Sequence, residues 1–220
     1  MSVARSASPT RHGQVFRNDV TGERAVILTD PLVHPKGLLV AHLTVRRGGR
    51  VALEHVHPTL RERFLVLDGT LAVSRNGVTS VLGRGEGSEV PPGARHDWWH
   101  TGAGETDVLV EVSPGARFVE MLTSLWGLVQ DGRTGGRPLP GLLQMAVTGS
   151  EYGDVMVPVS PPPWAQRLVG ATLGPVGRLL GKRPSYAEYS RSDTVVDPDP
   201  AALALLTADG ALDWQQARTA

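Results

Sequence analysis

The sequence predicts a mainly β domain, built as an antiparallel barrel or sandwich and followed by a helical extension. Between Gln14 and about Pro114, short β-branched runs recur and are separated by Gly, Pro or Asn-Gly. Beyond residue 115 the apolar residues change to helical spacing. The chain is therefore expected to consist of a disordered N-terminus (1–13), a β-barrel domain (14–115), a helical extension (116–190) and a tail with a short helix (191–220).

The strands of the β domain are expected to follow one another at short intervals. Asn76-Gly77 lies between two apolar runs and is a strong signal for a two-residue hairpin. Gly48-Gly49, Asp68-Gly69 and Pro91-Pro92-Gly93 mark further turns. The predicted strands are Ala25–Leu28, Leu38–Val45, Arg61–Leu67, Thr70–Ser74, Val78–Leu82 and Asp107–Val112.

Two longer helices are predicted in the extension, and a short one is expected around Ala201–Leu206. The first covers 116–129, where Phe118, Leu122, Leu125, Trp126 and Val129 recur at helical spacing. The second covers Trp164–Leu180 after three prolines, and a shared apolar face is expected for Trp164, Leu168, Ala171, Val176 and Leu180. The apolar faces could pack against the outside of the barrel, cover its mouth or form a homodimer interface. Packing against the barrel is favoured.

Composition excludes several classes of protein. Of the 220 residues, 22 are basic and 22 are acidic, and this balance argues against binding to nucleic acid or to an anionic membrane. Met1–His12 lack the apolar stretch of a signal peptide, and no run of about 18 apolar residues predicts a membrane span. A cytoplasmic protein is the simplest interpretation. Because the chain has no cysteine, any metal must be held by nitrogen and oxygen.

Three histidines and one glutamate predict a metal site. His55 and His57 are separated by one residue, so they lie on the same side of a strand. Glu62 opens the next strand and can turn back to the same point, and His96 follows about one hairpin later. Imidazole and carboxylate ligands suit one divalent transition metal, which could be iron, nickel, manganese, copper or zinc. Four such ligands on a six-coordinate metal leave two positions for water, dioxygen or substrate.

These residues form a pattern that resembles the cupin family. Its first motif is a Gly, five residues, His-x-His, three or four residues, Glu, six residues and Gly, matched by Gly49, His55, His57, Glu62 and Gly69. Its second motif is a Gly, five residues, Pro-x-Gly, two residues, His, three residues and Asn. Gly85, Pro91, Gly93 and His96 match it, and His100 replaces the Asn.

The resemblance spans about Gly37–Pro114 and points to single-domain, metal-binding cupins of type 2, the quercetin dioxygenase-like group. It implies a small jelly-roll barrel, also described as RmlC-like, with a pocket inside. It also implies that the metal ligands are His55, His57, Glu62 and His96.

Further residues are candidates for the pocket, each with an alternative. Glu62 could accept a proton as well as bind the metal, as the resemblance suggests. His100 could relay protons or could end a strand and bond to a loop carbonyl, and Glu111 could be a pocket base or an exposed residue. Trp98 and Phe64 could line the substrate pocket or pack as core. Tyr152 is a further acid–base candidate.

Three functions fit these residues. The first is a metal-dependent oxidoreductase, a dioxygenase that acts on a small aromatic or enol substrate. The second uses the metal as a Lewis acid for isomerase, lyase or cyclase chemistry and needs a separate acid or base. The third is a barrel that binds a small ligand without turnover. In each case the partner is a small molecule, and no cofactor other than the metal is implied.

Overall fold

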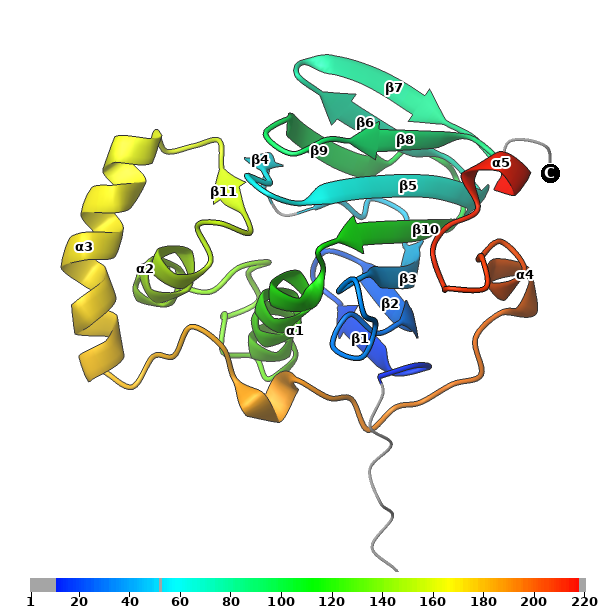
Figure 1. Cartoon of the computed structure of the whole chain (residues 1–220). Helices are drawn as coiled ribbons and strands as arrows, with labels where there is room; N and C mark the ends of the chain where they lie inside the picture. The colour runs from blue at the N-terminus through cyan, green and yellow to red at the C-terminus, as the bar shows by residue number, and fades with distance from the viewer. Residues whose placement is uncertain (1–10, 52, 218–220) are drawn as a thin grey trace, which may run out of the picture.

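The computed structural model describes residues 11–51 and 53–217, and it contains the predicted β domain (Figure 1). Two antiparallel sheets form the barrel. The first has the strand order β1-β2-β3-β10-β5-β8 and the second has the order β11-β4-β9-β6-β7. The mainly β fold with C-terminal helices is therefore confirmed.

The observed strands include all those that the apolar runs predict. The predicted hairpin at Asn76-Gly77 joins β6 to β7, and both turn residues have positive φ, 52° and 83°, as a tight hairpin of this kind requires. The strands are β1 (Val15–Asn18), β2 (Glu23–Thr29), β3 (Leu39–Val45), β4 (His55–Val56), β5 (Arg61–Asp68), β6 (Leu71–Arg75), β7 (Val78–Leu82), β8 (Gly87–Val90), β9 (Arg95–His100), β10 (Thr106–Ser113) and β11 (Val157–Pro158).

The main core lies between the sheets and follows the two-residue alternation of the strands. Phe64 and Val66 on β5 point into it, as do Val108 and Val110 on β10. Leu65 and the other intervening residues point to the outer face of the sheet. This alternation sends two separate sets of apolar side chains into two cores.

The first helix covers one side of the barrel. α1 (Ala116–Gln130) follows β10 directly and packs against β1 (Figure 1). Its Phe118 and Trp126 join the core between the sheets, as their helical spacing predicts. α1 therefore packs on the barrel, and its apolar face contributes to the core between the sheets.

The rest of the extension differs from the expectation. The sequence did not predict α2 (Leu142–Glu151), and α3 (Pro163–Leu179) packs on α2. The contact surface of α3 includes the buried Gly174 and Gly177, where a Cβ on Gly177 would come within 2.7 Å of Val147. Trp164 and Leu180, on the face expected to be buried, are 69% and 64% exposed. Packing of that face against the barrel was therefore a wrong expectation, and the homodimer alternative stays a prediction.

The tail forms a second core on the outer face of the six-stranded sheet. Residues 191–217 run along the barrel with the short helices α4 (Pro200–Leu203) and α5 (Trp214–Ala217), after the one-turn helix η1 (Ala187–Tyr189) (Figure 1). Ala202 and Leu212 are buried there against Leu65, Leu109 and other outward residues of the sheet. Runs such as Ala25–Leu28 are thus apolar on both faces because both faces are covered.

The first described residues are also held by the tail. Residues 1–10 lie outside the described residues, so the expectation for them is not addressed. Arg11 belonged to the expected disordered start, but it is buried, and its guanidinium Nη1 lies 3.5 Å from the Asp30 carboxylate. The Val15 amide donates to the Thr194 carbonyl at 2.9 Å. Within the described part of the chain, no helix has the length and apolar character needed to cross a bilayer.

Candidate metal centre and adjoining cavity

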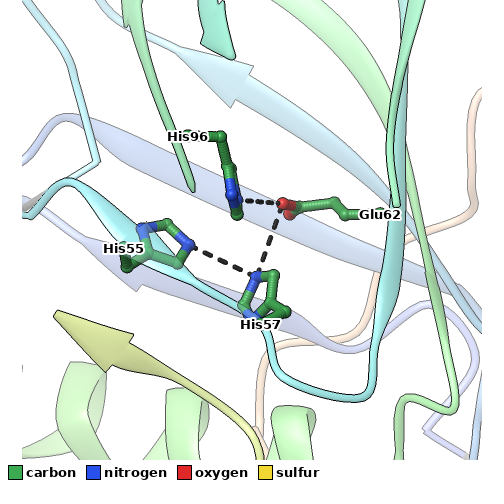
Figure 2. Close-up of side chains that lie close together, drawn as sticks. All are labelled: His55, His57, Glu62 and His96. Atoms are coloured by element: carbon green, nitrogen blue, oxygen red, sulfur yellow. Dashed lines mark hydrogen bonds and ion pairs between the residues drawn. The ribbon is translucent and has the colours of Figure 1, made fainter. Parts of the chain in front are cut away.

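The four predicted ligands converge on one point inside the barrel (Figure 2). His55 lies on β4, His57 follows that strand, Glu62 is the second residue of β5, and His96 lies on β9, where it pairs with His55. All four side chains are buried, and each offers a ligand atom within 4.8 Å of the others. His96 Nε2 lies 3.0 Å from Glu62 Oε2, and His57 Nε2 lies 3.5 Å from the same oxygen. The structure therefore brings together the group that the sequence predicts.

Each imidazole is oriented by a backbone carbonyl. The Nδ1 contacts join His55 to Leu53 at 2.7 Å, His57 to Val155 at 2.7 Å and His96 to Ala94 at 3.1 Å. A carbonyl oxygen only accepts, so each Nδ1 carries a proton and donates it. In the neutral ring Nε2 then bears a lone pair, and these three nitrogens face one another (Figure 2).

This arrangement fits a cation. His55 Nε2 and His57 Nε2 lie 3.3 Å apart, and two lone pairs at that distance repel unless a proton or a metal ion lies between them. Three imidazole nitrogens and one carboxylate oxygen are a donor set typical of first-row transition metals. The four-residue group could therefore hold one divalent metal.

The ionisation of the group also suits a metal. Burial alone would raise the pKa of Glu62, but the hydrogen bonds and charges of His57 and His96 outweigh it and hold that pKa well below its usual range. Burial, together with the neighbouring imidazoles, lowers the pKa of His55 to about 3. At neutral pH, Glu62 is thus ionised and His55 is neutral, which are the forms that bind metals. Burial would lower the pKa of His96, but the hydrogen bond and charge of Glu62 outweigh it and raise that pKa. In the metal-free protein His96 therefore donates a proton from Nε2 to Glu62, and a bound metal would displace that proton.

A cavity of about 80 Å³ adjoins the group. His55 and Glu62 line it, whereas most of its wall is apolar and comes from both sheets and from α1. The aromatic residues of the wall are Phe16, Phe64, Trp98, Phe118 and Trp126. Phe64 and Trp98 are both buried, so each is part of the core and of the cavity wall, and the two predicted alternatives coexist.

Sequence reasoning missed Glu23, a second carboxyl group in this cavity. Glu23 opens β2, is 8% exposed and accepts a hydrogen bond from the Thr21 hydroxyl. Burial raises the pKa of Glu23 to about 7; the Thr21 bond opposes this shift, and the charge of Glu62 adds to it. The signal was present in the sequence, because Glu23, Ala25 and Ile27 alternate on one face of the strand.

Two predicted acid–base candidates lie elsewhere. His100 ends β9 as expected, but the cavity wall does not include it, and its buried Nε2 has no hydrogen-bond partner among the described residues. Glu111 was expected to be exposed or to face the pocket, and both expectations were wrong. It is buried on the outer face of the sheet, where it accepts from Arg63 at 3.1 Å and from the Leu212 amide at 2.8 Å.

Tyr152 is also outside the cavity wall. It is buried below the Arg117 guanidinium, which lies 5.0 Å from the centre of its ring. Burial raises the pKa of Tyr152. None of the three candidates that the sequence suggested as a separate acid or base, His100, Glu111 and Tyr152, therefore lines the cavity.

Residues 41–112 match the model of the cupin domain family. Over 152 residues the chain is 26% identical to the "Probable oxidoreductase virH" of Hypocrea virens, which covers 62% of this chain and 67% of that protein.

Solved structures with similarity to the chain include an RmlC-like cupin from Shewanella frigidimarina, at 19% identity, a TM-score of 0.40 and coverage of 52% of this chain and 95% of the other. The polyketide cyclase RemF of Streptomyces resistomycificus has 18% identity, a TM-score of 0.38 and coverage of 52% and 79%. All four residues of the metal group lie within the matched segment, so the part of the chain that carries the site is similar to the cupin domain family.

Proposed function

We propose that this protein is a metal-dependent oxidoreductase, an oxygenase similar to the quercetin dioxygenase-like cupins, which acts on a small aromatic or enol substrate. The observation that carries the proposal is the position of the three-histidine, one-glutamate group beside a mainly apolar cavity, with His55 and Glu62 in the cavity wall. The similarity to a protein named as a probable oxidoreductase supports this class of reaction.

The residues of the chain have separate tasks in this reaction. A bound transition metal would supply Lewis acidity and, if it is redox-active, electron transfer to dioxygen. The carbonyls of Leu53, Val155 and Ala94 keep the histidine rings oriented. Aromatic side chains of the cavity orient a flat substrate, and α1 excludes bulk water. Glu62 stays ionised and provides the negative ligand.

A specific observation favours a second candidate function. Isomerase, lyase or cyclase chemistry with the metal as a Lewis acid needs an acid–base group that is not a ligand. Glu23 lies in the cavity wall and does not belong to the four-residue group. Proton-transfer chemistry therefore has a residue available in the same cavity.

The test is to load metal-free protein separately with iron(II), manganese(II), nickel(II), copper(II) and zinc(II). Oxygen uptake is measured with catechol and other small phenols and enols, and the same mixtures are incubated without oxygen. We expect oxygen uptake with a redox-active metal, none with zinc, and loss of uptake in His57→Ala. Anaerobic turnover with zinc would favour the second candidate. Tight binding without any turnover would contradict both and indicate a ligand-binding barrel.

A further inference from the structure

Glu23 is placed to contact whatever occupies the cavity. Within the described residues, the titratable side chains in the cavity wall are Glu23, His55 and Glu62. His55 and Glu62 both belong to the metal group. Glu23 comes from β2, on the same sheet as Glu62 but separated from it by β3 and β10. It is therefore the carboxyl group that a ligand beside the metal group can meet without displacing a metal ligand.

The contacts of Glu23 do not indicate that this side chain stabilises the fold. The Thr21 hydroxyl donates to its carboxylate, but no basic side chain forms an ion pair with Glu23 in the described ranges. Glu111 is a useful contrast, because it is equally buried but receives hydrogen bonds from Arg63 and from the tail. A buried carboxyl group without a cationic partner costs stability, which is a frequent property of functional residues.

We propose that Glu23 is the acid–base residue of the cavity and that its ligand is a small, single-ring enolisable ketone or phenol. With a ketone, the Glu23 carboxylate takes a proton from the carbon next to the carbonyl. The electron pair of the broken C–H bond forms the enolate, whose negative oxygen would be stabilised by a divalent metal held by the four-residue group. The carboxylic acid then returns the proton to carbon, so no oxidant or reductant is consumed. With a phenol, Glu23 takes the hydroxyl proton.

The ligand class follows from the wall of the cavity, whose aromatic and aliphatic side chains suit a flat, mainly apolar molecule of about one ring. The ionisation of Glu23 agrees with its role. Since burial raises its pKa to about 7, both the acid and the base form are present at neutral pH, where proton transfer in both directions is most efficient. The other titratable groups at the cavity, Glu62 and His55, are ionised and neutral, respectively, at that pH.

The first experiment observes the carboxyl group directly in metal-free, full-length protein. Infrared difference spectra or carboxyl ¹³C NMR are recorded as a function of pH for the wild type, Glu23→Gln and Glu111→Gln. We expect a carboxyl group that titrates near neutral pH in the wild type and in Glu111→Gln, and its absence in Glu23→Gln. Persistence of this signal in Glu23→Gln, or an ordinary acidic midpoint for Glu23, would overturn the proposal.

The second experiment uses cyclopentanone as the probe and follows deuterium exchange at its α-carbon in heavy water by NMR. Zinc-loaded wild type is expected to accelerate the exchange above the buffer rate, with a pH profile that follows the midpoint of Glu23. Glu23→Gln should exchange roughly 10²-fold more slowly, whereas Glu111→Gln should match the wild type. No acceleration by the wild type, or equal rates in wild type and Glu23→Gln, would overturn the proposal.

The ligand class rests in part on the proposed metal-dependent function, and the metal content of every sample separates the two. Protein that binds no metal but still shows the Glu23 titration and a Glu23-dependent exchange would contradict the metal function and support the role of Glu23. Protein that binds metal and accelerates the deuterium exchange equally with and without Glu23 would support the metal function and contradict the role of Glu23.

Discussion

Glu23 on β2 and Glu62 on β5 line the same cavity, and the negative charge of Glu62 helps to raise the pKa of Glu23. The environments of the two carboxyl groups shift their pKa values in opposite directions. Hydrogen bonds from His57 and His96 outweigh burial at Glu62 and keep it ionised, whereas burial dominates at Glu23 and raises its pKa to about 7. One cavity therefore holds a permanent anion beside a group that can gain or lose a proton, a pattern typical of acid–base sites.

Glu23→Gln should increase stability at alkaline pH in metal-free protein. The pKa of Glu23 is raised from 4.5 in the unfolded chain to about 7 in the folded protein, so the folded state holds the proton more tightly. This proton binding stabilises the folded state fully below pH 4.5, and the stabilisation is lost as the pH rises to 7. The difference between 4.5 and about 7 corresponds to about 3 kcal/mol. The free energy of unfolding in urea, measured for both proteins, should shift in favour of Glu23→Gln by about 2–3 kcal/mol between pH 5 and pH 8.

Glu111→Gln is the control for this measurement. It removes a buried carboxyl group that is paired with Arg63, so it should lower stability and show no such gain at alkaline pH. If Glu23→Gln instead loses the same stability at both pH values, the Glu23 side chain stabilises the fold, and its ionised form does not destabilise it.

Metal loading should lower the pKa of Glu23. A divalent cation bound by the nearby group offsets the charge of Glu62 and favours the ionised form of Glu23. We expect the carboxyl titration of Glu23 to move to a lower pH by roughly one unit when zinc is added. In the His57→Ala variant, the same addition of zinc should leave the midpoint where it is. A midpoint in the wild type that does not respond to zinc would show that the metal and Glu23 do not share one cavity.

Filling the cavity should block the reaction without removing the metal. Ala25 lines the cavity on the same face of β2 as Glu23, so Ala25→Leu reduces the space for a ligand. The metal content should stay unchanged, while deuterium exchange or oxygen uptake falls by roughly 10²-fold. Ala202→Leu places the same bulk in the core under the tail, where it should reduce stability but not turnover. If Ala25→Leu keeps full activity, the substrate binds elsewhere.

Replacing a glycine inside a helix by alanine usually stabilises the protein. Packing of the η1 segment on α1 should reverse this effect at Gly127. A Cβ on Gly127 would lie 2.1 Å from Cγ of Tyr189, so Gly127→Ala should destabilise the protein by about 1–3 kcal/mol. At Gly170 in α3 the nearest neighbour is the Ser150 Cβ at 3.7 Å, and Gly170→Ala should stabilise by about 0.5–1 kcal/mol. Thermal unfolding of the two variants checks the signs, and a stabilising Gly127→Ala would contradict this packing.

Local patterns in the sequence were sufficient to predict β2, β3, β5, β6, β7 and β10, the hairpin at Asn76-Gly77 and the four residues of the metal group. These features depend on residues that are close in sequence or on spacings within strands and turns. α1 was predicted for the same reason, since Phe118, Leu125 and Trp126 recur at helical spacing and are all buried.

Features that depend on distant segments were not predicted. The carbonyl that orients His57 comes from Val155, 98 residues further along the chain. Glu111 looked exposed because nothing in its own strand shows that Leu212 of the tail covers it. Similarly, α3 packs on α2, so its exposed face could not be recognised while α2 was unpredicted. The sequence of α2 has no strong helix start signal, because its N-cap is Gly141, which makes no side-chain hydrogen bond.

The most direct test of the account is the metal content of the purified protein, measured by elemental analysis for the wild type, His96→Gln and His100→Gln. His96 and His100 are both buried on β9, but His96 alone of the two belongs to the four-residue group. We predict about one transition metal ion per chain in the wild type and in His100→Gln, and at least roughly a tenfold loss in His96→Gln. A wild type that stays metal-free after incubation with each of the five metals, or equal losses in both variants, would contradict the metal centre.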